Sequence, residues 1–121
     1  MKTLLSIIGL TLLTISCKHD PATPENACTA TDPLAISWVK DLTASLDQSY
    51  CISSLFQGTY KGQTVYFTRI TDPACEYIIF STTLLDCTGQ RIKQYGSSLR
   101  EQQAFSSEVV GAKTIYTSKR R

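Results

Sequence analysis

Five cysteines and one histidine are the side chains of this 121-residue chain with the widest chemical repertoire. Thiolates and imidazoles act as nucleophiles or metal ligands, and cysteine pairs form disulfides. No two cysteines have Cys-x-x-Cys spacing, and the single histidine, His19, precedes every segment with a helix or strand pattern. A zinc site or a Ser-His-Asp site therefore lacks its histidines. We expect no catalytic residue, no metal and no cofactor.

Paired carboxylates are the remaining catalytic chemistry that the sequence offers. Asp72, Glu76 and Asp86 lie at the ends of predicted strands, where two of them could meet and exchange protons. Such residues are more often turn formers and surface charges. We therefore predict that the protein is not an enzyme, with a small carboxylate-dependent hydrolase as an alternative.

The first seventeen residues have the pattern of an export signal. Lys2 supplies a positive start, and residues 4–15 are uncharged and mostly apolar. This stretch suits a signal peptide and is shorter than the roughly 20 residues of a membrane span. Ser16 is a small residue of the kind that signal peptidases require before the cut, and Cys17 follows it.

Residues 13–17, Leu-Thr-Ile-Ser-Cys, resemble the lipobox of bacterial lipoproteins. The resemblance implies cleavage before Cys17, a diacylglyceryl group on its sulfur and an acyl chain such as palmitate on the new N-terminus. It also implies a lipid anchor in the outer membrane of a Gram-negative bacterium, on the periplasmic or the surface face. An ordinary secretory signal and an uncleaved anchor are the alternatives.

The chain then divides into three parts: a signal peptide (1–16), a lipidated tether (17–30) and one folded domain (31–121). Residues 20–27 of the tether contain Pro21 and Pro24 and no large apolar residue, which is typical of an extended linker. Loss of Lys2 lowers the net charge from +2 to +1. A nearly neutral chain gives no reason to expect a nucleic-acid partner.

The domain begins with an amphipathic helix, predicted over residues 33–47. Asp32 can cap the free amides, and Pro33 suits the first helical position. An apolar residue then recurs every fourth position, at Leu34, Trp38, Leu42 and Leu46. We expect Trp38 to belong to the core rather than to a ligand site.

After Cys51 the apolar period changes to two, which predicts strands. The expected strands are residues 53–60, 63–70, 76–85 and 91–95, with turns at 61–62, 71–74 and 86–89. A short helix over 99–109 and a strand over 113–117 follow with a weaker pattern. The predicted class is α+β, a two-layer sandwich with one N-terminal amphipathic helix on a four- to five-stranded antiparallel sheet.

This element order resembles the beta-lactamase-inhibitor-like and PepSY-like domains. Residues 60–92, especially the stretch 60–66 and the turn 86–89, also resemble a family of uncharacterised small Gram-negative lipoproteins. That resemblance implies no particular activity.

With Cys17 lipidated, an even number of cysteines remains, which in a small exported domain predicts two disulfides. Buried free thiols and a metal site are the alternatives. The meander brings the turn at 71–75 to the C-terminal end of the helix and the turn at 86–89 to its N-terminal end. We therefore predict the pairs Cys51–Cys75 and Cys28–Cys87.

Tyrosines offer a candidate binding face. If the residues of successive strands alternate strictly, one face of the sheet collects Tyr60, Tyr66, Tyr77 and Tyr95, together with Phe56. An open face rich in tyrosine could bind a protein or a glycan. The alternative is that these tyrosines simply fill half-buried strand positions.

The sequence thus predicts a membrane-anchored cell-envelope lipoprotein with a non-catalytic binding or structural role. A secreted inhibitor or immunity protein, acting through the loops at 71–74 or 86–90, is the main alternative.

Overall fold

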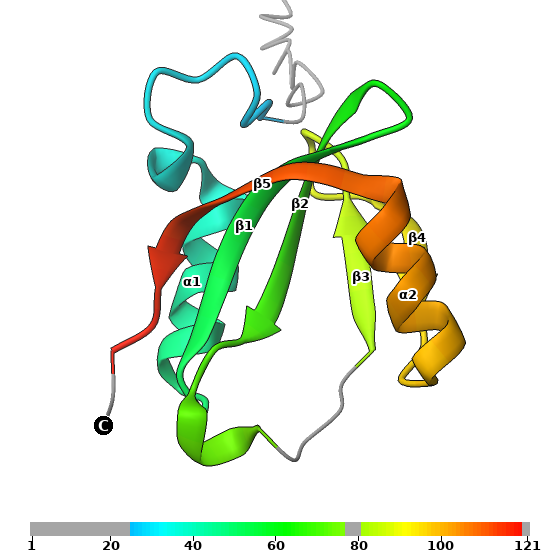
Figure 1. Cartoon of the computed structure of the whole chain (residues 1–121). Coiled ribbons are helices and arrows are strands. Elements are labelled where there is room, and N and C mark those ends of the chain that lie inside the picture. Colours follow the sequence, from blue (N-terminus) through cyan, green and yellow to red (C-terminus); the bar gives the residue numbers. More distant parts are fainter. Residues whose placement is uncertain (1–24, 77–80, 120–121) are drawn as a thin grey trace, which may run out of the picture.

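The structure, a computed structural model, describes residues 25–76 and 81–119. In chain order (Figure 1) the elements are η1 (Pro33–Ala35), α1 (Ser37–Asp47), β1 (Ser53–Tyr60), β2 (Gln63–Ile70), η2 (Pro73–Cys75), β3 (Thr82–Leu85), β4 (Arg91–Tyr95), α2 (Leu99–Glu108) and β5 (Val109–Thr117). Two helices and a five-stranded antiparallel sheet make this an α+β protein. No helix in the described part has the length and apolar character that crossing a membrane requires.

The β1–β2 hairpin is the most regular part of the sheet. Tyr60 pairs with Gln63 across a two-residue turn formed by Lys61 and Gly62, which both have positive φ. Positive φ at both positions characterises the turn that matches the right-handed twist of hairpin strands. The predicted turn at 61–62 is confirmed.

The strand order is β4-β3-β2-β1-β5, so the last two strands lie at opposite edges. The segment between them, which contains α2, must therefore connect one edge of the sheet to the other (Figure 1). β5 extends over Val109–Thr117 and is longer than the predicted strand 113–117.

The predicted helical range 33–47 is divided into two pieces. The Asp32 side chain accepts a hydrogen bond from the Leu34 amide at 3.0 Å, which caps the short η1. Ile36 is extended, and α1 then begins at Ser37. The amide of Ser37 donates to the carboxylate of Glu25 at 2.7 Å, so the chain preceding the helix supplies its cap.

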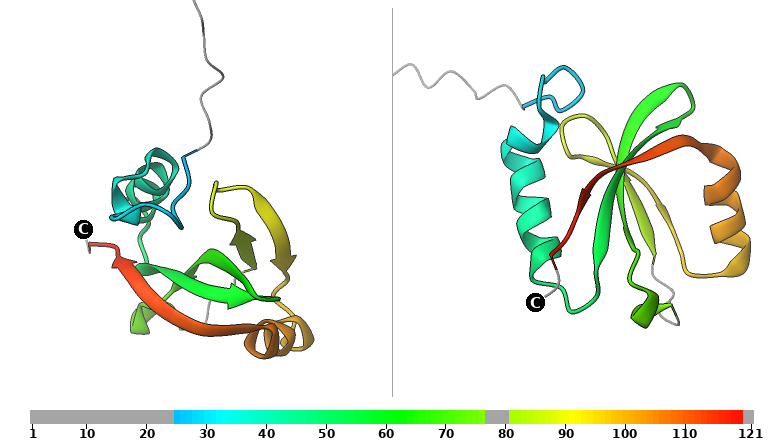
Figure 2. Two further views of the ribbon diagram at one scale, coloured as in Figure 1. Left: turned by 90° about the horizontal axis from the view of Figure 1, so that it is seen from above. Right: turned by 60° about the vertical axis from the view of Figure 1, so that its left-hand side comes forward.

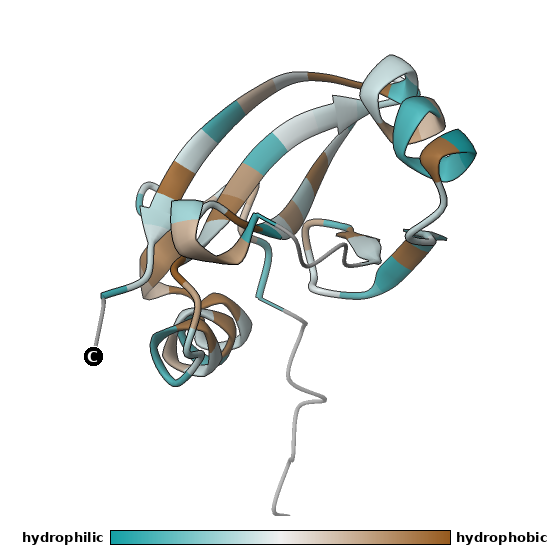
Figure 3. Ribbon diagram, turned by 60° about the horizontal axis from the view of Figure 1, so that its bottom comes forward, coloured by the Kyte–Doolittle hydropathy of each residue, from teal (hydrophilic) through white to brown (hydrophobic). Residues whose placement is uncertain are grey.

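Apolar side chains form two clusters on opposite faces of the sheet. The first contains Val39 of α1 with Leu55 and Tyr66 of the strands, and Trp38, Leu42 and Leu46 pack against it. The second contains Phe105 of α2 with Val65, Phe67, Leu84 and Tyr95. Burial on both faces of the sheet requires consecutive apolar residues, and Val65, Tyr66 and Phe67 of β2 are all buried. Figure 3 shows the hydropathy along the strands and helices that enclose the two clusters.

The two helices accordingly stand on either side of the sheet (Figure 2). The fold thus has a second helix where only one was expected to cover the sheet. Ser98 caps α2, because its hydroxyl accepts from the Glu101 amide at 3.2 Å and donates to the Glu101 carboxylate at 3.1 Å.

Candidate functional site

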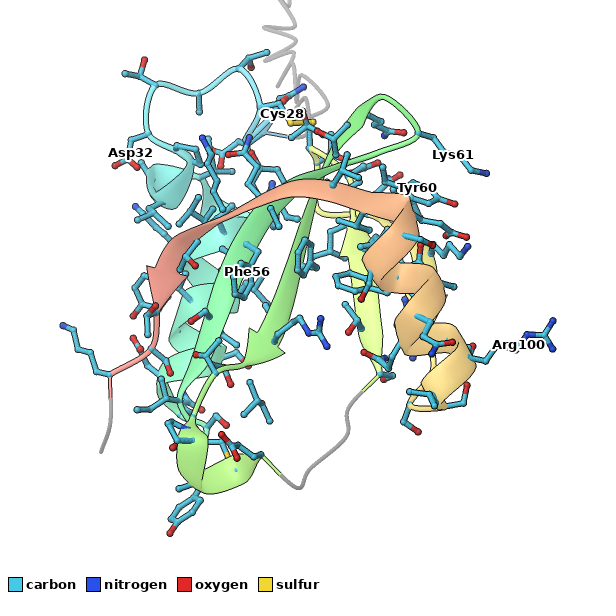
Figure 4. The ribbon with its side chains drawn as sticks, in the orientation of Figure 1. Cys28, Asp32, Phe56, Tyr60, Lys61 and Arg100 are labelled. Carbon is cyan, nitrogen blue, oxygen red and sulfur yellow. A yellow bond between two sulfur atoms is a disulfide. The ribbon has the colours of Figure 1, made fainter. Side chains whose placement is uncertain are left out.

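The four remaining cysteines form two disulfides, and the predicted pairing is confirmed. Cys28 bonds Cys87 with a Cα–Cα distance of 5.3 Å, and Cys51 bonds Cys75 with a Cα–Cα distance of 6.1 Å. One bridge fastens the segment before η1 to the β3–β4 turn, at the end of the molecule where Figure 4 labels Cys28. The other fastens the end of α1 to η2. Cys17 lies outside the described residues.

The predicted common face of tyrosines does not form. Tyr66 lies in the cluster beneath α1, whereas Tyr60 and Tyr95 pack in the cluster beneath α2. Tyr66 and Tyr95 are also fully or almost fully buried, at 0% and 2% exposure. Tyr77 is outside the described residues. Tyr60, Tyr66 and Tyr95 therefore lie in or against the core on two faces and do not form one open surface.

Trp38 belongs to the core, as predicted. Its ring meets Tyr66 edge-on with centroids 5.5 Å apart. Its indole nitrogen is buried and has no hydrogen-bond partner among the described residues.

Of the three carboxylates considered for catalysis, Asp72 and Glu76 line one hollow, described below, and Asp86 lies apart from them. Asp72 is buried and accepts hydrogen bonds from the amides of Ile52 and Ala74 at 3.1 and 2.9 Å. Asp86 lies at the other end of the β-sheet, where it accepts from the amides of Thr88 and Gln90 at 2.8 and 3.0 Å. Both residues are turn formers.

The pKa of Asp86 reflects this role. Its partial burial favours the neutral acid, but hydrogen bonds from Thr88 and from the amides of Gln90 and Gly89 outweigh burial and lower the pKa. The carboxylate is thus held ionised to close the β3–β4 turn.

A second polar cluster joins β4 to the junction of α2 and β5. The Glu108 carboxylate accepts from the ammonium of Lys93 at 2.8 Å and from the hydroxyl of Tyr95 at 2.5 Å. Burial, followed by the Glu108 bond, raises the pKa of Tyr95 to about 12, and the Lys93 bond lowers the pKa of Glu108. Because Lys93 and Tyr95 both donate to Glu108, these hydrogen bonds hold β4 against the end of α2. We therefore assign the cluster a structural role.

A hollow lies where β2 ends, β3 begins and α2 begins. Its volume is about 540 Å³, within the range of small-molecule sites. We call it the Arg69 hollow, and its lining comprises Thr68, Arg69, Ile70, Thr71, Asp72, Pro73, Cys75, Glu76, Ser81, Thr82, Ser97, Leu99 and Gln102. Residues 77–80, which connect two parts of this lining, are outside the described residues, and the site is built without them.

Arg69 is held in place by two residues of α2. Its guanidinium carbon lies 4.8 Å from the centre of the Phe105 ring, and its Nη2 donates to the Gln102 side-chain oxygen at 3.0 Å. Gln102 is fixed in turn, because its amide nitrogen donates to the Gly96 carbonyl at 2.7 Å. An exposed arginine fixed in this way has already lost much of the side-chain entropy that binding a ligand would otherwise cost.

No protein-family model, curated protein or solved structure matches the chain. Its function must therefore be inferred from its own residues. No group of three metal-ligating side chains is found in the described ranges.

Sequence reasoning did not identify Arg69 as a site residue. A signal was nevertheless present, because Arg69 lies two positions after Phe67 in a strand and must share its face. Phe67 meets Phe105 at a centroid distance of 5.0 Å, so α2 covers that face and meets the arginine. What the sequence did not reveal is that α2 would lie there.

Proposed function

We propose that the chain is exported, cut before Cys17 and anchored by acyl chains on Cys17 to the outer membrane of a Gram-negative cell. In this proposal the folded part is a non-catalytic binding protein of the cell envelope, and the Arg69 hollow is its binding site. Several acyl chains give stable attachment, since each buried CH₂ contributes about 0.8 kcal/mol.

The observation that carries the proposal is the position of the hollow relative to the predicted tether. The Ala27 amide donates to the Cys87 carbonyl at 2.8 Å, next to the Cys28–Cys87 bridge. Cys87 lies beside Thr64 at the start of β2, whereas Ile70 at its end lines the hollow. Eight residues in β2 span roughly 23 Å at about 3.3 Å per step. A tether entering at Ala27 would therefore leave the hollow at the far end of the domain, open to a partner.

A non-catalytic role is supported by the carboxylates. The carboxylates of Asp72 and Asp86 each accept hydrogen bonds from turn amides, at opposite ends of the sheet. Both loops of the inhibitor alternative are next to disulfides, and the first of them also lines the Arg69 hollow. Cys75 bonds Cys51 beside the first loop, and Cys87 in the second bonds Cys28.

Lipidation is tested by mass spectrometry of membrane fractions from cells that express the native sequence. We expect a mature protein that begins at acylated Cys17. Cys17→Ser should release the domain from the membrane or leave the precursor uncut. An unmodified soluble protein from the native sequence would contradict the anchor.

Binding at the hollow is tested by a photo-crosslinking amino acid incorporated in living cells. At Leu99, which is 75% exposed and lines the hollow, we expect specific adducts in envelope fractions. At Val110, which is 56% exposed and lies outside the hollow, we expect none. Equal labelling from both positions, or none from Leu99, would refute the proposed site.

A further inference from the structure

The Arg69 hollow combines a fixed cation with an exposed apolar side chain. Arg69 has five N–H donors in a planar fork. Within residues 25–76 and 81–119 it donates one hydrogen bond, to Gln102, and forms no ion pair with a carboxylate. An exposed edge of the fork can therefore donate two hydrogen bonds to the two oxygens of a planar anion.

The charges of the lining restrict which anion fits. Arg69 is the one basic residue in the described lining, and Asp72 and Glu76 are acidic. The Glu76 carboxylate in the lining would repel a dianion such as phosphate more strongly than a monovalent anion. A monovalent carboxylate needs only the one cation and matches the fork in geometry.

Leu99 supplies the second recognition element. It is the first residue of α2 and is 75% exposed, although it borders a concave surface. Gln102, one turn further along the helix, lines the same hollow and holds Arg69. A ligand whose carboxylate sits on Arg69 can thus cover Leu99 with a neighbouring apolar group.

We propose that the Arg69 hollow binds the carboxyl-terminal end of a short peptide, with the terminal carboxylate on Arg69 and an apolar last side chain on Leu99. This inference rests on the proposed function, because it assigns a ligand class to the same site. Ser97 and Thr68 also line the hollow, and hydroxyls of this kind can donate to or accept from a peptide backbone.

The test is an NMR titration of the isotope-labelled domain, with its disulfides formed, using acetyl-Ala-Ala-Leu as the probe. We expect the backbone amides of Arg69, Leu99 and Gln102 to shift with the free acid and not with the C-terminal amide of the same peptide. Arg69→Gln should weaken binding at least tenfold. Arg69→Lys should also weaken it severalfold, because lysine keeps the charge but loses the fork.

Arg100→Gln is the matched control, because it also replaces an arginine by glutamine, in α2 rather than in β2. Arg100 is exposed and points away from the body of the molecule in Figure 4. It should leave the peptide affinity unchanged. Thermal unfolding of each variant will show whether lost binding reflects lost folding, and Arg69→Lys keeps a cation that can lie over the Phe105 ring.

The remaining outcomes separate the ligand class from the proposed function. Equal binding of the acid and the amide at these residues would refute the carboxylate while keeping the hollow as a site. Inorganic phosphate that shifts the same amides and competes with the acid would also refute it. No shift with any probe, together with Leu99 crosslinks in cells, would overturn the peptide ligand alone. Absence of both would overturn the site itself.

Discussion

Gly89 shows how one residue couples the sheet to α1. Its φ of +83° is in the left-handed region that glycine adopts readily. A Cβ at this position would lie 2.8 Å from the Trp38 ring, which is too close for any real contact. The turn at 86–89 therefore needs a glycine for its backbone and also for the tryptophan behind it.

Gly89→Ala should destabilise the domain by about 3 kcal/mol or more, because backbone strain of about 1–2 kcal/mol adds to overpacking against Trp38. Gly62→Ala is the control, since Gly62 has a φ of +73° but an added Cβ meets nothing within 4 Å. It should cost only the backbone part. Equal losses in urea unfolding experiments would show that the Trp38 contact is unimportant.

Two buried tyrosines should respond differently to loss of the hydroxyl. The Tyr66 hydroxyl is buried and has no hydrogen-bond partner in the described part, whereas that of Tyr95 donates to Glu108. We expect Tyr66→Phe to change the unfolding free energy by less than about 0.5 kcal/mol or to stabilise, and Tyr95→Phe to cost about 1–2 kcal/mol. A large loss in Tyr66→Phe would indicate a bound water on that hydroxyl.

The pKa of Tyr95 also predicts a pH dependence. Burial and the Glu108 bond raise it to about 12, above its ordinary value of 10.0. A group whose pKa is raised by folding stabilises the protein below its unfolded pKa and loses that contribution as pH rises. Melting temperatures should therefore fall between about pH 10 and pH 12. The fall should be smaller in Tyr95→Phe than in Tyr50→Phe, which alters a side chain that is 95% exposed.

At the scale of the element, α1 is held at both ends by groups distant in sequence. Glu25 accepts from the Ser37 amide at its start, and the Ser37 bond lowers the pKa of Glu25. At its end, Asp47 accepts from the hydroxyl of Tyr116 at 2.6 Å and from the Lys119 amide at 3.1 Å. The helix is thus fixed to β5 as well as to the strands it covers.

The two disulfides close loops of different length, with sequence separations of 59 for Cys28–Cys87 and 24 for Cys51–Cys75. In the chain-entropy model the longer loop stabilises more, about 4 against about 3.5 kcal/mol. Double serine variants should therefore lose stability in that order in urea unfolding. The reverse order would mean that contacts of the native state, rather than loop entropy, dominate.

The edge strand β5 carries features that discourage edge-to-edge association. Its pairing with β1 shifts register at two places, Gly111 has a φ of +64°, and Lys113 is exposed. Register shifts and lysines are recognised protections of exposed edges. We therefore favour the hollow, rather than this edge, as the binding surface.

At the scale of the whole molecule, the proposal implies an orientation on the membrane. Figure 4 shows that Lys61, in the hairpin turn, and Cys28 are at the same end of the domain. Ala27, which precedes Cys28 in the chain, bonds Cys87 at that end. Tyr50 is beside Cys51 at the opposite end. A fluorescent amino acid at position 61 of the lipidated protein in vesicles should be quenched more by headgroup-attached quenchers than one at position 50. Equal quenching would contradict this orientation.

Much of the fold followed from local patterns. The boundaries of β1, β2 and β4 agree with the predicted strands, and α2 begins at the predicted residue 99. The disulfide pairs also followed, because in a meander each turn returns to a known end of the helix. These features depend on short stretches of sequence whose periodicity and turn residues act independently of the rest of the chain.

The face on which Tyr66 lies was the clearest error. Residues that pair directly across a hairpin share a face, and a two-residue turn pairs even numbers with odd ones, as Gln57 does with Tyr66. Tyr60 and Tyr66 must therefore lie on opposite faces. The predicted turn at 61–62 already contained this information, so the sequence could have excluded the common face.

The sequence by itself determined β1, β2, β4, the hairpin turn and the helical stripe of α1, because each depends on local periodicity or on turn chemistry. The cysteine pairs followed from the order in which these elements come. Only the tertiary structure decided that β5 pairs with β1 and that α2 covers the second face beside Phe67. Both depend on contacts between residues far apart in the chain, whose free energies no local pattern encodes. The same distant contacts place Phe105 and Gln102 against Arg69 and so create the hollow.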